Sequence, residues 1–252
     1  MKTKLSLAVS VALLSAGMLT GCSDDKEPTA AASQQEAPKS NVAPMLQYIP
    51  ADSPYFMATR ESMPEQEAFD FYRRMQPQGN LESNLDELRR TLPEIDDDVQ
   101  HSLVTLLIAM GEELDSVETL DDAHALGIKL GPQAALYGLG ILPVLRFELH
   151  DEDAFRETLQ RILTKADLNP STATTNGTDY WVLTPEGPVN AILAIIDQQL
   201  LLSLVPQDAS DELLAQVLGS TPPDSNIGDT SALAELEQRH GFTPYGAGQI
   251  NA

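Results

Sequence analysis

The chain has 252 residues, of which 38 are acidic and 15 are basic, so its formal net charge at pH 7 is −23. This balance disfavours nucleic-acid binding, which needs clustered Lys and Arg against the phosphates. It equally disfavours adsorption to anionic lipid by charge alone. The sequence contains a single cysteine, so no intramolecular disulfide can form and stability has to come from a hydrophobic core.

The first 21 residues have the pattern of a bacterial export signal. Lys2 and Lys4 precede an apolar run over residues 5–14, which is too short to cross a membrane, since crossing needs roughly twenty apolar residues. Residues 19–22, Leu-Thr-Gly-Cys, end the signal. This tetrapeptide resembles the lipobox of bacterial lipoproteins. The resemblance implies cleavage between Gly21 and Cys22 and lipidation of Cys22 on its sulfur and its new amino group.

The alternative is an ordinary secretory signal with a stray cysteine near its end. Cleavage before Cys22 would remove Lys2 and Lys4, leaving 13 basic against 38 acidic residues and a charge of −25. Attachment would then depend on acyl chains such as palmitate, and two or three chains make a durable anchor. In the family of the motif, serine after the cysteine permits transfer to the outer membrane, whereas aspartate favours the inner one. Ser23 therefore favours the outer membrane, with the protein facing the periplasm, although Asp24 follows it.

Residues 22–44 are predicted to form a flexible tether. They are rich in Ala, Ser, Gln, Glu and Pro, and Val42 is their one large apolar residue. Such a segment buries too little apolar surface to offset the entropy of ordering it. We expect a folded domain over residues 45–252.

The first part of this domain is predicted to be a helical block that follows one edge strand at residues 55–59. Pro64 suits a helix start and Pro93 a helix end. A short helix is expected within residues 115–127, before Gly127. Apolar residues recur at helical spacing in three stretches, at Phe69, Tyr72 and Met75, at Leu81, Leu85, Leu88 and Leu92, and from Val99 to Leu114.

Short apolar runs separated by Gly and Pro follow residue 128 and predict strands. Strands are expected at residues 134–140, 144–149, 180–183, 191–196, 200–205 and 242–250, with helices at 151–166, 210–219 and 230–241. Because residues 191–205 are apolar on both faces, this hairpin, which turns at residues 197–198, is expected in the centre of the sheet. The fold class is predicted as α+β, in which the helical N-terminal block packs on one side of a mostly antiparallel sheet.

The end of the chain allows two interpretations, which we weigh equally. Residues 242–250 form a predicted strand with no tail after it, so the chain either ends abruptly or is an incomplete part of a larger protein. A weak echo between residues 137–142 and 245–250, which share a Tyr-Gly-x-Gly pattern, is compatible with an incomplete duplication and also with chance.

The sequence predicts no catalytic, metal or cofactor site. It has no G-x-S-x-G motif, and its one S-x-x-K after the signal, from Ser23 to Lys26, lies in the predicted tether. The acidic triplets at residues 96–98 and 151–153 could chelate calcium, but each precedes a predicted helix, where carboxylates cap free N–H groups. The four histidines lie far apart without a metal-binding spacing, so each is interpreted as a solvated side chain; they are His101, His124, His150 and His240.

Two glycine motifs are interpreted as structural. Gly138 and Gly140 form a G-x-G without the third glycine of a nucleotide-binding loop, and Pro143 stands where a helix would start. Asn176-Gly177 is expected to be a hairpin turn.

Two segments resemble a family of uncharacterised bacterial lipoproteins that carry a domain of unknown function. They are residues 48–56, Tyr-Ile-Pro-Ala-Asp-Ser-Pro-Tyr-Phe, and residues 137–149, Tyr-Gly-Leu-Gly-Ile-Leu-Pro-Val-Leu-Arg-Phe-Glu-Leu. The resemblance implies a longer parent protein of unknown activity, and it supplies no site residue.

We therefore expect a non-enzymatic, lipid-anchored envelope lipoprotein that binds an envelope protein or a cell-wall partner, or supports envelope assembly. The alternative is an envelope hydrolase whose carboxylates and histidines meet only in the fold. A third hypothesis, a solute-capturing lipoprotein that serves a transporter, fits poorly, because such proteins have two lobes with parallel sheets.

Overall fold

The computed structural model of the chain describes residues 44–75, 80–183, 188–231, 235, 238–239 and 247–250. The chain divides into two compact units, Met1–Ser40 and Asn41–Ala252, and every described residue belongs to the second. The predicted signal peptide, Cys22 and nearly all of the predicted tether lie outside the described residues. So does most of the predicted helix at 230–241.

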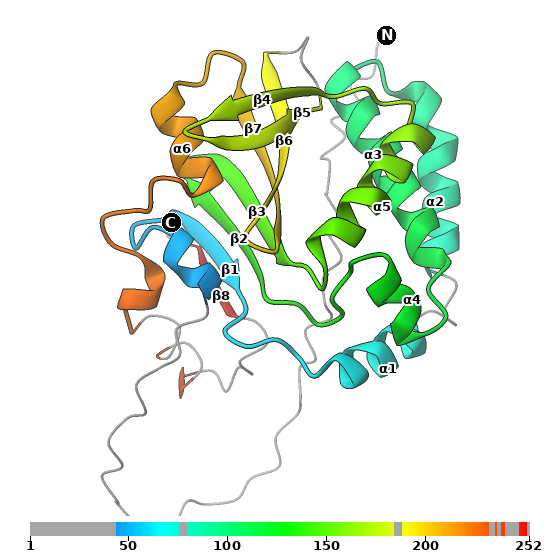
Figure 1. Cartoon of the computed structure of the whole chain (residues 1–252), viewed down its shortest axis with the longest axis horizontal. Coiled ribbons are helices and arrows are strands. Elements are labelled where there is room, and N and C mark those ends of the chain that lie inside the picture. Colours follow the sequence, from blue (N-terminus) through cyan, green and yellow to red (C-terminus); the bar gives the residue numbers. More distant parts are fainter. Residues whose placement is uncertain are drawn as a thin grey trace, which may run out of the picture. The chain divides into compact units, whose positions relative to one another are not determined.

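A run of helices from α1 to α4 precedes most of the strands along the second unit (Figure 1). The helical elements are η1 (Pro44–Tyr48), α1 (Glu65–Met75), α2 (Asn80–Thr91), η3 (Leu92–Glu94), α3 (Asp98–Asp115), α4 (Leu120–Ala125), α5 (Glu152–Lys165), α6 (Asp211–Leu218) and η4 (Ile227–Asp229). The strands are β1 (Tyr55–Ala58), β2 (Ala134–Leu139), β3 (Leu142–Glu148), β4 (Ser171–Thr175), β5 (Thr178–Val182), β6 (Val189–Ile196), β7 (Gln199–Pro206) and β8 (Ala247–Ile250).

The strands form one sheet in the order β4-β5-β6-β7-β3-β2-β1-β8, and all neighbours are antiparallel. The predicted α+β class is confirmed, and so is the central place of the β6–β7 hairpin. The prediction that residues 55–59 form an edge strand is wrong, because β8 pairs along the other side of β1, with Tyr55 opposite Ile250.

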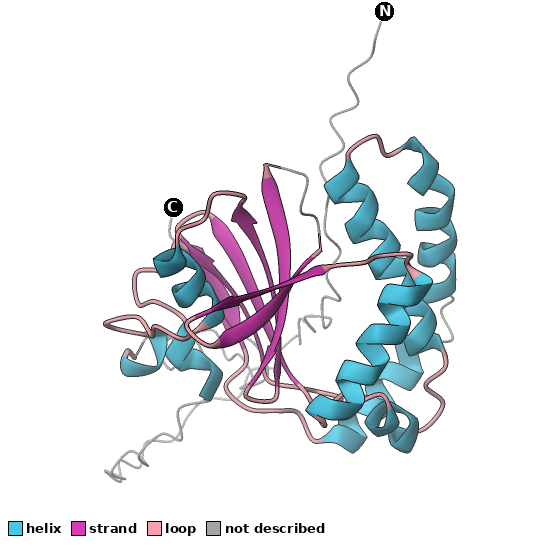
Figure 2. Cartoon of the chain, turned by 45° about the horizontal axis from the view of Figure 1, so that its top comes forward, coloured by secondary structure: helices cyan, strands magenta, loops and turns pink. Residues whose placement is uncertain are grey.

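Helical elements cover both faces of the sheet, which corrects the prediction that helices pack on one side only (Figures 1 and 2). Alternating residues of a strand point to opposite faces. In β6, Ile192 and Ala194 therefore pack in a core with η1, α6 and η4, whereas Leu193 and Ile195 pack in a second core with α3 and α5.

Local sequence signals account for the turns and helix starts. The β4–β5 turn at Asn176-Gly177 and the β6–β7 turn at Asp197-Gln198 both have positive φ at two successive residues, as a two-residue type I′ hairpin turn requires. Helix α6 begins after Ser210, whose hydroxyl accepts from the Leu213 N–H, and ends at the left-handed Gly219.

Candidate functional site

Three polar side chains from different parts of the chain converge at one place: Glu65, His124 and His150. His124 Nε2 lies 3.0 Å from Glu65 Oε2, within hydrogen-bond distance, and His150 Nδ1 lies 3.8 Å from Glu65 Oε1. The two imidazole rings are stacked, with their centroids 3.6 Å apart and their planes 5° from parallel. One ligand atom from each of the three residues lies within 4.8 Å of the others. We call this set the His–Glu cluster.

The backbone around Gly127 positions both histidines. His124 is in the last turn of α4, where its carbonyl accepts from the Gly127 N–H at 2.9 Å, and the Ile128 N–H bonds to Ala123 O at 2.9 Å. This is the Schellman pattern of a helix C-terminus, and it needs the left-handed φ of +73° that Gly127 adopts. The Gly127 carbonyl then accepts from the His150 N–H at 2.9 Å.

Glu65 reaches the histidines because the segment after β1 is held against the segment before β2. The Met63 N–H donates to Gly131 O at 2.9 Å, and helix α1 begins at Glu65, directly after Pro64. Proline is well suited to a helix start, since its missing N–H has no helical partner there. The cluster therefore combines the first residue of α1, the last turn of α4 and the residue that precedes the N-cap of α5.

Glu148, two residues before His150, is a second charged side chain, and residues of the same segments donate hydrogen bonds to it. Glu148 accepts from Lys129 Nζ at 2.6 Å, from Ser62 Oγ at 2.8 Å and from the Gln133 N–H at 3.1 Å. Burial pushes the pKa of Glu148 up, but these three donors together outweigh it and hold the pKa below its ordinary value. Glu148 therefore stays ionised at neutral pH and fixes the end of β3.

The His–Glu cluster is accessible to small solutes. The side chains of Glu65, His124 and His150 are 27%, 25% and 39% exposed. Two imidazoles and one carboxylate can bind a metal ion, or they can form an acid/base pair in which the carboxylate orients and polarises an imidazole. The geometry thus supports ion binding and proton transfer alike.

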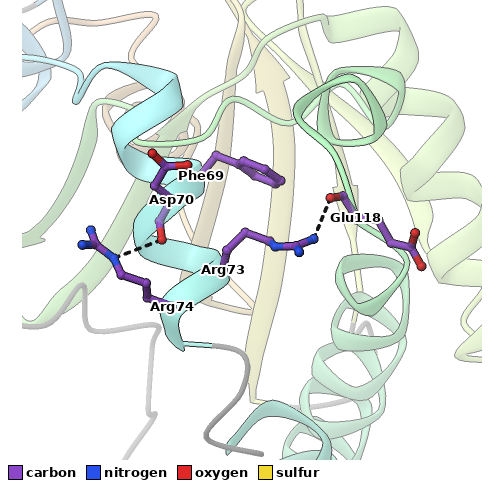
Figure 3. Close-up of a pocket in the computed structure, with 5 residues that line it drawn as sticks. All are labelled: Phe69, Asp70, Arg73, Arg74 and Glu118. Carbon is purple, nitrogen blue, oxygen red and sulfur yellow. Dashed lines mark hydrogen bonds between the residues drawn. The ribbon is translucent and has the colours of Figure 1, made fainter.

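An open hollow of about 600 Å³ lies further along α1 and is distinct from the cluster (Figure 3). The Arg73 side chain extends towards the backbone of Glu118, and Arg73 Nη1 donates to the Glu118 carbonyl at 3.0 Å, while the Glu118 carboxylate points away. Phe69, Asp70 and Arg74 complete its lining, and Glu65 is not part of it. Two of the residues that line the hollow are arginines, and positively charged residues are scarce in this acidic chain.

The structure changes the interpretation of the histidines. The prediction that His124 and His150 are isolated is wrong. The antiparallel bridge between Ile128 and Leu149 brings their segments together. His101 is exposed on α3, and His240 lies outside the described residues, as do Gly21 and Cys22. No spacing in the sequence signals this pairing, since it depends on contacts between residues 59 positions apart, such as Glu65 and His124.

The capping interpretation of the acidic triplets is confirmed. Asp97 accepts from the Gln100 N–H at 2.8 Å and begins α3, and Asp151 accepts from the Ala154 N–H at 2.8 Å and begins α5. These carboxylates meet the free N–H groups and the positive end of each helix dipole.

No family model, no curated protein and no solved structure significantly matches the chain. The resemblance of residues 48–56 and 137–149 to uncharacterised lipoproteins therefore stays a prediction. Within the part of the chain that the structure describes, no helix is both long and apolar enough to span a membrane.

Proposed function

We propose that this protein is a lipid-anchored, periplasm-facing lipoprotein of the bacterial envelope that acts as a binding or envelope-support module. The observation that carries the proposal is the Leu-Thr-Gly-Cys sequence at residues 19–22, which follows a basic and then an apolar segment and contains the only cysteine of the chain. A thiol next to small residues is what lipidation before signal cleavage requires.

The start of the folded domain supports this arrangement. Met45 and Leu46, close to the start of the described residues, are buried in the core that the sheet forms with α6. About twenty residues then separate Cys22 from the domain, which gives it a reach of several nanometres if they are extended. A tethered domain of this kind meets partners that are fixed in the envelope.

The charge of the chain restricts the partners. A mature protein of charge −25 is repelled by anionic lipid headgroups and by nucleic acid, so membrane attachment rests on the acyl chains. We propose an envelope protein or a cell-wall fragment as partner. Ser23 favours the outer membrane as the site of attachment.

The anchor is tested by metabolic labelling of cells with radioactive palmitate, which compares the wild-type protein with Cys22→Ser. We expect label and membrane fractionation for the wild type, and neither for Cys22→Ser. A Ser23→Asp variant is the matched control, because it should keep the label while it shifts the protein towards the inner membrane. A wild-type protein without label would contradict the anchor.

The binding role is tested by cross-linking in intact envelopes, followed by purification of the tagged protein. We expect a recurrent protein or cell-wall adduct that is lost when the tether is deleted but Cys22 is kept. Repeated recovery of the protein alone would contradict a binding module.

An envelope hydrolase is the second candidate, because Glu65 and His124 form a hydrogen-bonded acid/His pair at 3.0 Å. The hollow beside Phe69 and Arg73 has other lining residues, and we prefer the binding role because the anchor motif supports it. Cell-wall cleavage by the purified protein that disappears in Glu65→Gln would reverse this preference.

A further inference from the structure

We propose that Glu65, His124 and His150 bind one divalent transition-metal ion of the zinc class, with the remaining coordination positions left to water or to a ligand. The inference does not depend on the lipid anchor, since it rests only on residues of the folded domain.

The distances in the His–Glu cluster fit this role. Zinc binds imidazole nitrogen and carboxylate oxygen at about 2.0–2.2 Å, so two ligand atoms on one ion lie no more than roughly 4.4 Å apart. Glu65 is already 3.0 Å from His124 and 3.8 Å from His150. All three ligand atoms lie within 4.8 Å of one another. The two imidazole rings are stacked in parallel, so they have to turn out of the stack before a nitrogen of each points at one ion, and both side chains are partly exposed.

The backbone that carries the ligands is fixed before any ion binds. Gly127 bonds to His124 through its N–H and to His150 through its carbonyl, each at 2.9 Å. A Cβ atom at Gly127 would lie 2.4 Å from Asp151 O and from the Phe155 N, so the turn packs tightly on the start of α5. Ion binding therefore needs the imidazole rings to turn but no rearrangement of the backbone that carries them.

The donor set decides between classes of metal ion. Ca²⁺ and Mg²⁺ prefer six or more oxygen ligands, whereas imidazole favours Zn²⁺, Cu²⁺, Ni²⁺ and Fe²⁺. Two histidines and one carboxylate leave coordination positions open, as in catalytic zinc sites rather than in closed structural ones. The strongly negative charge of the whole chain raises the local concentration of cations around it.

The competing interpretation is a structural contact only, in which His124 is hydrogen-bonded to Glu65 and stacked on His150. Both interpretations predict the same geometry for the protein without metal. Only the metal site predicts tight Zn²⁺ binding with Glu65, His124 and His150 as ligands. The test therefore measures the metal directly.

Equilibrium dialysis of the full-length protein in detergent against Zn²⁺, with excess Ca²⁺ and Mg²⁺ to occupy nonspecific carboxylates, measures stoichiometry and affinity. We expect one Zn²⁺ per chain. The variants Glu65→Gln, His124→Ala and His150→Ala should each weaken binding by about tenfold or more, since each removes one of three protein ligands. His101→Ala removes an exposed histidine elsewhere and is the matched control, with unchanged binding.

X-ray absorption at the zinc edge gives a second readout, and we expect the signal of two imidazole ligands in the wild type and of one in His150→Ala. Glu65→Gln keeps the size of the side chain. If circular dichroism shows that a histidine variant is unfolded, the Zn²⁺ affinity of Glu65→Gln tests the proposal instead. Equal Zn²⁺ affinity in the wild type and in Glu65→Gln, or a zinc spectrum without imidazole, would overturn the proposal.

Discussion

Arg146, in β3, carries a positive charge into the interior of the domain and is fully buried. Its guanidinium donates to Tyr137 Oη at 3.2 Å, Gln199 Oε1 at 3.2 Å and Val217 O at 3.1 Å. The ring of Tyr48 lies 3.9 Å from the guanidinium carbon. No carboxylate forms an ion pair with it among the residues that the structure describes. Neutral acceptors, an aromatic face and the negative end of α6 therefore compensate the charge.

The substitution Arg146→Ala is expected to lower the free energy of unfolding by roughly 3 kcal/mol or more. It leaves buried acceptors without donors, each costing about 1–3 kcal/mol, and it opens a cavity. Urea denaturation measures the loss. The control is Arg89→Ala, which removes an exposed arginine that pairs with Asp86 and Glu112 and should leave the midpoint nearly unchanged. Equal midpoints for the two variants would contradict this account of Arg146.

Glu148 links stability to pH. Because its pKa is lowered in the folded protein, its contribution is fully present above its ordinary pKa of 4.5 and is lost as the pH falls through the lower folded-state value. Glu148→Gln should cost roughly 1–2 kcal/mol of unfolding free energy at pH 7, by loss of charge-assisted hydrogen bonds.

The difference between Glu148→Gln and the wild type should shrink below about pH 4.5, which denaturation curves at several pH values will show. Glu157→Gln, at an exposed position of α5, is the matched control and should keep the pH profile of the wild type. A difference that stays constant from pH 7 to strongly acidic pH would refute the linkage.

At the scale of elements, Gly127 joins the end of α4 to the segment between β3 and α5. Gly127 combines a φ of +73° with close packing, whereas Gly177, in the β4–β5 turn, has a φ of +79° and no atom within 4 Å of a Cβ built there. A substitution at Gly177 therefore measures the energetic cost of the left-handed backbone conformation alone. A substitution at Gly127 measures that cost together with the cost of a steric clash.

Gly177→Ala should lower the free energy of unfolding by about 1–2 kcal/mol, the cost of a left-handed conformation. Gly127→Ala should cost clearly more, because its Cβ would meet the backbone of Asp151 and Phe155. It should also weaken Zn²⁺ binding, since both histidines are attached to this turn, while Gly177→Ala leaves binding unchanged. Thermal unfolding and dialysis measure the two effects. Similar losses in both variants would contradict the role given to Gly127.

Elements with local signals could be predicted from the sequence. Helix α5 has an N-cap at Asp151 and an apolar stripe that packs in the core, and the β6–β7 hairpin is apolar on both faces. Strand β4, Ser171–Thr175, has no large apolar residue and could not be recognised apart from its turn. It belongs to the sheet through its antiparallel pairing with β5.

Features that depend on distant partners could not be predicted. Strand β1 has the sequence of an edge strand, but its neighbour β8 comes from the other end of the chain, at residues 247–250. For the same reason His124 and His150 meet only because the bridge between Ile128 and Leu149 aligns their segments. Composition and periodicity report the burial of a residue and say little about its neighbours.

At the scale of the whole molecule, we propose that an acidic folded domain follows an export signal and a flexible tether. Its charge disfavours binding to anionic surfaces, so in this proposal covalent lipid supplies the attachment to the membrane. In our account, therefore, every function of the protein in the envelope depends on Cys22.

Mass spectrometry of the protein purified from membranes tests this most directly, because trypsin cuts after Lys26, four residues beyond Cys22, and so releases a short N-terminal peptide. We predict that this peptide begins at Cys22 and carries a diacylglyceryl group on sulfur and an acyl chain on its amino group. An N-terminal peptide with a free Cys22 thiol, or one that still contains residues of the signal, would contradict the account.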